Sequence, residues 1–190
     1  MAKGDESKLS QLFLKTLKNR SKQFKNIYIE EKIKIISDLT CLYSIDMTFE
    51  FLLGFSEVDI VFFEKIVFDK KIEFNKSSKG IESLFRAYNN KKNTKTLNIP
   101  FVILELKSGH LTTDAIRSRS VVAKNIKNIF PFCLYIFVCE KCSKKNETLM
   151  RQGKNFDAFF IFENEITYKD IINIYDKFIY QYIENKIKNL

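Results

Sequence analysis

The stretch PFVILELKSG (residues 100–109) decides how the chain is interpreted. Its almost continuous run of apolar residues predicts a central β-strand that is covered on both faces. One carboxylate, Glu105, and one amine, Lys107, are set into this run, and residues two apart in a strand point to the same face. Because burial of a charge is costly unless the charge is paired or bound to a metal, this strand is expected to carry a functional site.

A second apolar stretch, VDIVFF (residues 58–63), contains one more carboxylate, Asp59. Residues 47–51 alternate between apolar and polar side chains, which predicts another strand, and residues 54–57 are expected to form a turn between the two. The two strands are therefore predicted to form a hairpin, and residues 66–74 alternate again and are expected to extend that sheet. Residues 64–98 are interpreted as a polar insertion, with a short helix inside the segment 75–98.

Apolar residues at helical spacing predict helices over residues 5–24 and 168–189, and the same spacing favours a helix over 27–44. The β-branched residues of 27–44 would also suit a strand, so that alternative stays open. Thr112 or Thr113 is expected to cap a helix over 114–129, residues 132–139 are predicted to form a buried strand, and the apolar run 156–162 a further strand. Together these elements predict one α/β domain over residues 1–190, a mixed β-sheet flanked by helices with its core at about 30–165.

The composition fits such a domain and suggests a polyanionic partner. The 190 residues are 45% hydrophobic, and 32 Lys and Arg outnumber 23 Asp and Glu to give a net charge of +9. No apolar run is long enough to cross a bilayer and the N-terminus has no secretory signal, so we expect a soluble, cytoplasmic protein without a membrane partner. The four cysteines are expected to be reduced thiols, and a metal site at Cys139 and Cys142 is the less favoured alternative.

Paired carboxylates at the junction of two strands can hold Mg²⁺, and a nearby lysine can orient or help to deprotonate a water molecule. The arrangement of Asp59, followed by Glu105-Leu106-Lys107 on a later strand and then by a helix, resembles the PD-(D/E)xK nuclease superfamily. The resemblance covers about residues 30–140 and implies a restriction-endonuclease-like fold. It also implies that Asp59, Glu105 and the backbone carbonyl of Leu106 bind the metal, and that Lys107 is the catalytic lysine.

The sequence departs from the family pattern in two places. Val58 stands where many members have proline, and the interval between Asp59 and Glu105 is long. Many members also place a glutamate on the helix before the hairpin. Glu30 or Glu31 could fill this role, with Glu6 as a more distant option, and Glu31 is favoured.

The helix after the motif carries a concentration of polar and basic residues that includes Arg117, Arg119, Ser120 and Lys124. Arginine offers bidentate contacts to phosphate and lysine offers a point charge, so this helix is expected to contact a nucleic-acid backbone. A basic face exposed only to solvent is the alternative. His110, the single histidine, is either an auxiliary base or an exposed loop residue.

These observations predict a Mg²⁺-dependent endonuclease that hydrolyses phosphodiester bonds in DNA, most like a small type II restriction enzyme or a related defence or repair nuclease. Mn²⁺ is expected to substitute for Mg²⁺. Cleavage of both strands needs two active sites, which favours a homodimer. An RNA endonuclease of the cap-snatching type is one alternative, although those domains often have an N-terminal histidine ligand that this chain lacks. A non-catalytic nucleic-acid-binding module is the other.

Overall fold

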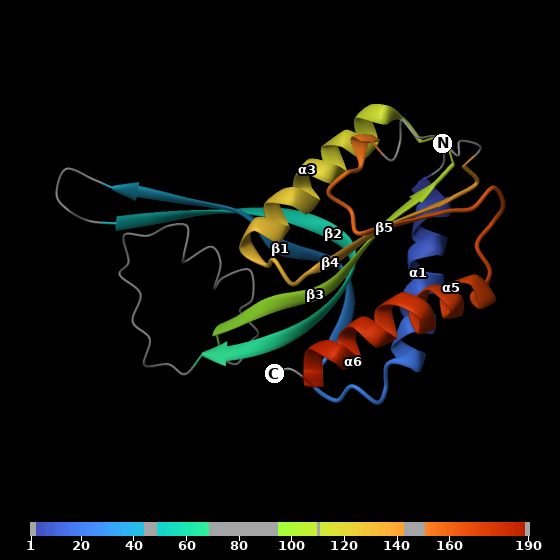
Figure 1. Cartoon of the computed structure of the whole chain (residues 1–190), viewed down its shortest axis with the longest axis horizontal. Helices are drawn as coiled ribbons and strands as arrows, with labels where there is room; N and C mark the ends of the chain where they lie inside the picture. Colours follow the sequence, from blue (N-terminus) through green and yellow to red (C-terminus); the bar gives the residue numbers. More distant parts are fainter. Residues whose placement is uncertain (1–2, 44–48, 69–94, 110, 143–150, 189–190) are drawn as a thin grey trace.

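The computed structural model describes residues 3–43, 49–68, 95–109, 111–142 and 151–188. One helix and two long strands make up the first half of the chain, and the second half holds three strands, the helix α3 between β3 and β4, and a helical C-terminal end (Figure 1). The elements are α1 (Lys3–Arg20), β1 (Tyr28–Tyr43), β2 (Phe49–Phe68), β3 (Lys95–Ser108), α3 (Thr113–Ile129), β4 (Leu134–Glu140), β5 (Ala158–Ile161), α5 (Tyr168–Ile174), the π-helical turn η1 (Tyr175–Ile179) and α6 (Tyr180–Lys188).

The five strands form one mixed sheet in the order β1-β2-β3-β4-β5. The β1–β2 and β2–β3 pairs are antiparallel, whereas the β3–β4 and β4–β5 pairs are parallel. Parallel neighbours need a crossover connection, and α3 supplies it between β3 and β4. The predicted α/β class with a mixed sheet and flanking helices is confirmed.

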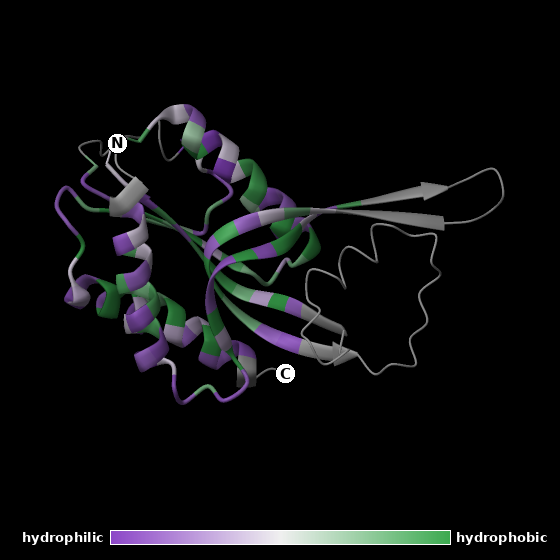
Figure 2. Cartoon of the chain, turned by 180° about the vertical axis from the view of Figure 1, so that it is seen from behind, coloured by the Kyte–Doolittle hydropathy of each residue, from purple (hydrophilic) through white to green (hydrophobic). Residues whose placement is uncertain are grey.

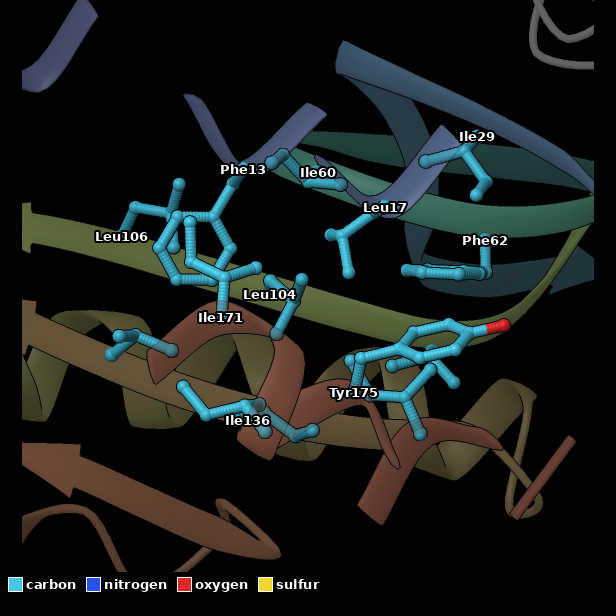
Figure 3. Close-up of a cluster of buried hydrophobic side chains, with 14 of the residues drawn as sticks. Phe13, Leu17, Ile29, Ile60, Phe62, Leu104, Leu106, Ile136, Ile171 and Tyr175 are labelled. Carbon is cyan, nitrogen blue, oxygen red and sulfur yellow. The ribbon is translucent and has the colours of Figure 1, made fainter. Parts of the chain in front are cut away.

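Helices cover both faces of the sheet, α3 on one side and α1 with the C-terminal helices on the other (Figure 1). The sheet therefore has two cores: the α3 layer, between the sheet and α3, and the α1 layer, between the sheet and α1 with the C-terminal helices. Neighbouring residues of β3 pack into different cores, Ile103 in the α3 layer and Leu104 in the α1 layer. Figure 3 shows the α1 layer, where Phe13 and Leu17 meet Leu104, Ile136 and Ile171. The prediction that β3 is a central strand buried on both faces is therefore confirmed.

The predicted helices at the two ends of the chain and after the motif are present. Thr112 caps α3 by accepting a hydrogen bond from the Ala115 N–H, and Thr167 forms a capping box with Asp170 at the start of α5. Figure 2 shows both hydrophilic and hydrophobic residues along the helices, as expected of amphipathic helices that pack on a sheet. No helix in the described part of the chain is long and apolar enough to cross a membrane.

The helix predicted over 27–44 is wrong, because these residues form the edge strand β1. The isoleucines Ile29, Ile33 and Ile36 have helical spacing, but Ile29 packs in the α1 layer while Ile35 and Ile36 pack in the α3 layer. The register between β1 and β2 runs from Tyr28–Phe63 to Tyr43–Phe49. Such a long ladder favours the extended conformation that β-branched side chains also prefer, which outweighs the helical spacing.

The predicted turn over 54–57, and with it the hairpin between residues 47–51 and 58–63, is also wrong, since one strand, β2, passes through these residues without a break and pairs with β1. Gly54 lies opposite Asp38, next to a register shift between Ile36 and Asp38. A Cβ atom at Gly54 would come within 2.8 Å of the Asp38 Cβ. The glycine therefore marks a close approach of two strands at a bulge and not a chain reversal.

The predicted insertion over 64–98 lies only partly within the described residues. Residues 64–68 belong to β2 and residues 95–98 belong to β3, so both ends of this segment are strand. The predicted extension of the sheet is confirmed for residues 66–68. The rest of the segment, including the short helix expected within 75–98, lies outside the described residues.

A second glycine makes a testable contribution to the core. Gly153 is buried, and a Cβ atom there would lie 2.1 Å from the Phe159 ring and 2.9 Å from that of Phe156. Gly153→Ala is therefore expected to lower the free energy of unfolding by about 2 kcal/mol, as overpacking of a filled core does. Urea denaturation measures this loss, and adding Phe159→Leu should recover part of it. If the stability losses of the two substitutions simply add in the double variant, the clash of the new methyl group with Phe159 is not the cause of the destabilisation.

Candidate active site

Asp59 and Glu105 meet at the end of the β2–β3 ladder. The register between these strands ends at Ile60 and Leu104. One step further, the Leu106 N–H donates a hydrogen bond of 2.8 Å to Asp59 Oδ2, so a side-chain carboxylate accepts where a β2 carbonyl would otherwise do so. The N–H and C=O groups of one strand residue point to the same side of the strand, so the Leu106 carbonyl also points to the side on which β2 lies.

Glu105 is fully buried, with 0% of its surface exposed, and faces the α3 layer. The Tyr135 hydroxyl on β4 donates a hydrogen bond of 3.3 Å to Glu105 Oε2. Arg119 Nε on α3 lies 2.8 Å from Oε1, but this contact is an ion pair without hydrogen-bond geometry. Within the described part of the chain, Oε1 therefore accepts no hydrogen bond.

This environment raises the pKa of both carboxyl groups. Burial and the neighbouring Asp59 charge together raise the pKa of Glu105 to about 8, against the opposing effects of Arg119 and Lys107. Burial also raises the pKa of Asp59, while the Leu106 N–H and the same two cations lower it. Two adjacent carboxylates that are this poorly compensated would be stabilised by a further cation.

Lys107 is held by a residue from the other end of the chain. Its Nζ lies 3.0 Å from Glu6 Oε1 at the start of α1. The Glu6 charge also contributes to the raised pKa of Asp59. The N-terminal turn of α1 thus lies against the carboxyl end of β3, and Figure 1 shows the two elements side by side.

The favoured glutamate, Glu31, lies opposite Ile60 in the β1–β2 ladder, one residue from Asp59, and its side chain is engaged by α1. Glu31 Oε2 accepts a hydrogen bond of 2.7 Å from Ser10, and Glu30 pairs with Lys65 at 3.2 Å. Glu6, the more distant option by sequence, is the glutamate that contacts Lys107. Only the packing of α1 against the sheet brings these positions together, so local spacing carried no signal for it.

The residues predicted on the basic helix divide into three kinds of environment. Arg119 reaches Glu105, whereas the Arg117 side chain is 60% exposed and its Nε donates to Gln152 at 3.0 Å. Lys124 is exposed. Ser120 is only 2% exposed, and its hydroxyl and carbonyl oxygens both accept hydrogen bonds from Asn155. The interpretation of Ser120 as part of a phosphate-contacting face is therefore wrong. The helical spacing predicted correctly that Ser120 lies in the helix, but it did not reveal that its side chain is buried against Asn155.

A second buried glutamate, Glu140, lies at the same edge of the sheet and was not identified from the sequence. The Ser108 hydroxyl donates to its Oε1 at 2.9 Å, and the Ile166 N–H donates to its Oε2 at 3.0 Å. Both oxygens of Glu140 are thus hydrogen-bonded, as is usual for a buried polar group that stabilises a fold. The contrast marks Glu105 as the unusual member of the pair.

The donors at the motif fit a hard divalent cation. Two carboxylates and one backbone carbonyl are oxygen ligands of the kind that Mg²⁺ prefers, with water completing its coordination. Glu105 Oε1 supplies a buried oxygen that lacks a hydrogen bond. No group of three or more His, Cys, Asp or Glu side chains among the described residues is placed to hold a metal ion, so a site here depends on the two acids and the carbonyl.

Two further candidates from the sequence are the cysteines and His110. Cys133, Cys139 and Cys142 are buried free thiols in the α3 layer. His110 lies outside the described residues. Comparisons of the chain with models of known protein families and with curated proteins found no match.

Proposed function

We propose that the chain is a metal-dependent endonuclease with a restriction-endonuclease-like fold, which hydrolyses phosphodiester bonds in DNA. The observation that carries the proposal is the fully buried Glu105, which lies beside Asp59 and Lys107 with one carboxylate oxygen free of hydrogen bonds. A carboxylate that served only the fold would be satisfied in the way that Glu140 is.

Asp59, Glu105 and the Leu106 carbonyl would hold Mg²⁺, or Mn²⁺ in its place. Such an ion supplies positive charge next to a phosphate and makes a water molecule more acidic. The Lys107 ammonium, which Glu6 contacts at 3.0 Å, would stabilise negative charge on a non-bridging phosphate oxygen or orient the attacking water. Arg117 and Lys124 would contact the nucleic-acid backbone from the exposed side of α3.

DNA is favoured over RNA because cap-snatching RNA endonucleases often use an N-terminal histidine ligand, and the single histidine of this chain is His110. The net charge of +9 suits either polyanion. A homodimer would provide the two active sites that double-strand cleavage needs.

The test is a cleavage assay on plasmid DNA and on labelled single-stranded RNA, in Mg²⁺, in Mn²⁺ and in EDTA. We expect the wild type to cut plasmid DNA with either metal and to be inactive in EDTA. Lys107→Ala should lower the rate by about 100-fold, because it removes a charge that assists proton transfer or the developing anion. Lys177→Ala, which removes an exposed lysine of η1, is the matched control and should cut like the wild type.

The alternatives give different patterns in the same assay. Cleavage of RNA alone would replace the DNA assignment with an RNA endonuclease. Nucleic-acid binding that is equally strong in EDTA, with no cutting of either substrate, would replace the enzyme with a binding module.

A further inference from the structure

Arg119 connects the buried acid to the solvent. Its side chain is 36% exposed, while Glu105, the partner of its Nε, is fully buried. Its Nη1 lies 3.5 Å from the Glu57 carbonyl oxygen, at the upper limit of a hydrogen bond. The guanidinium is therefore held mainly by the charge of Glu105, and part of the Arg119 side chain is open to solvent.

The contact between Arg119 and Glu105 differs from a structural arginine–carboxylate pair in the same protein. Arg20 Nη2 donates to both oxygens of Asp176, at 3.0 and 2.8 Å, and thereby joins α1 to η1. Arg119 makes no such directed contact with Glu105, and Oε1 has no hydrogen-bond donor in the described part of the chain. Because the attraction is mainly ionic, a second cation can compete for the same oxygen.

The charges around the motif favour such an exchange. Three acids (Glu6, Asp59 and Glu105) face two bases (Lys107 and Arg119), which gives a formal charge of 2 − 3 = −1 when all are ionised. A divalent ion would change this to +1 and would repel a guanidinium that lies 2.8 Å from one of its own ligand atoms. The exposed part of the side chain leaves Arg119 a path toward solvent, where a substrate phosphate offers it bidentate hydrogen bonds.

We propose that Arg119 has two alternative partners: the ionised Glu105 of the metal-free protein, and the phosphate of the substrate once a divalent cation occupies the carboxylates. This inference rests on the proposed nuclease function and adds a coupling to it. Metal binding frees the arginine, so the phosphate-binding group becomes available only in a protein that is loaded for cleavage.

Side-chain NMR at pH 8.5, where Glu105 is mostly ionised in the metal-free protein, tests the exchange directly, with Mg²⁺ alone as the probe. The chain has five arginines, so the Nε–Hε region contains few signals, and Arg119→Lys identifies the one that belongs to Arg119. We expect Mg²⁺ to shift this signal toward the position of a free arginine and to broaden it through faster exchange with solvent. The Arg20 signal, from the pair with Asp176, should not move.

A second variant links the response to the carboxylate. In Glu105→Gln the Arg119 signal should already lie at the released position, and Mg²⁺ should leave it there. The exchange is overturned if backbone signals near the motif respond to Mg²⁺ in the wild type while the Arg119 signal stays unchanged. If no signal near the motif responds to Mg²⁺ or Mn²⁺, the metal site itself is wrong, and the proposed function falls with it.

Discussion

Glu105→Gln is expected to reduce Mg²⁺-dependent cleavage by about a thousandfold or more while the protein stays folded. The change keeps the size of the side chain but removes the charge from the most buried donor of the site. An amide oxygen is a far weaker ligand for Mg²⁺ than a carboxylate, and charge stabilisation in a water-excluded site is a large term in catalysis. Initial rates on plasmid DNA, measured with circular dichroism spectra of the same preparations, provide the comparison.

Glu140→Gln is the matched control, because it makes the same chemical change at the other buried glutamate of this sheet edge. Glu140 receives its hydrogen bonds from Ser108 and Ile166 and lies outside the proposed machinery. We expect this variant to lose about 1 kcal/mol of stability and to keep its cleavage rate within a few-fold of the wild type. Equal losses of activity in both variants would show that the sheet edge is a structural element rather than a catalytic one.

The sequence predicted the motif strand well because its chemistry is local. PFVILELKSG is apolar on both faces, and the structure buries β3 between two helical layers. The sequence also indicated an unusual buried carboxylate in this strand, and Glu105 is indeed fully buried beside Asp59. A charged residue within an apolar run is a local signal, so one sequence was enough to find it.

The predictions that failed depended on partners that are distant in sequence. Whether residues 28–43 form a helix or a strand depends on the ladder with β2, and the spacing of three isoleucines could not reveal that ladder. Gly54 resembled a turn because a close cross-strand contact with Asp38 selects the same residue type as a chain reversal. The contact of Glu6 with Lys107 spans 101 positions and requires α1 to be docked first.

The stability of the metal-free protein is expected to fall as the pH rises from 6 to 8.5. Glu105 has its pKa raised from 4.5 to about 8 in the folded state, so between these values the folded protein holds a proton that the unfolded chain has released. The stabilisation from that proton is fully present below about pH 4.5 and is lost as the pH rises through about 8. Over the chosen interval the loss amounts to about 2 to 3 kcal/mol, which urea denaturation in EDTA would measure.

Mg²⁺ should reverse this loss. Arg119 and Lys107 only partly compensate the buried charge of ionised Glu105, and a bound divalent cation would compensate the remainder. A ligand that binds only the folded state stabilises it by mass action, so saturating Mg²⁺ at pH 8.5 is expected to restore most of the missing free energy. Glu105→Gln, which cannot ionise, should show a much smaller decline in stability from pH 6 to 8.5 and little response to Mg²⁺. A wild type whose stability falls with pH but does not recover in Mg²⁺ would mean that Glu105 is a buried acid without a metal, and that the cost of its burial serves something other than phosphodiester hydrolysis.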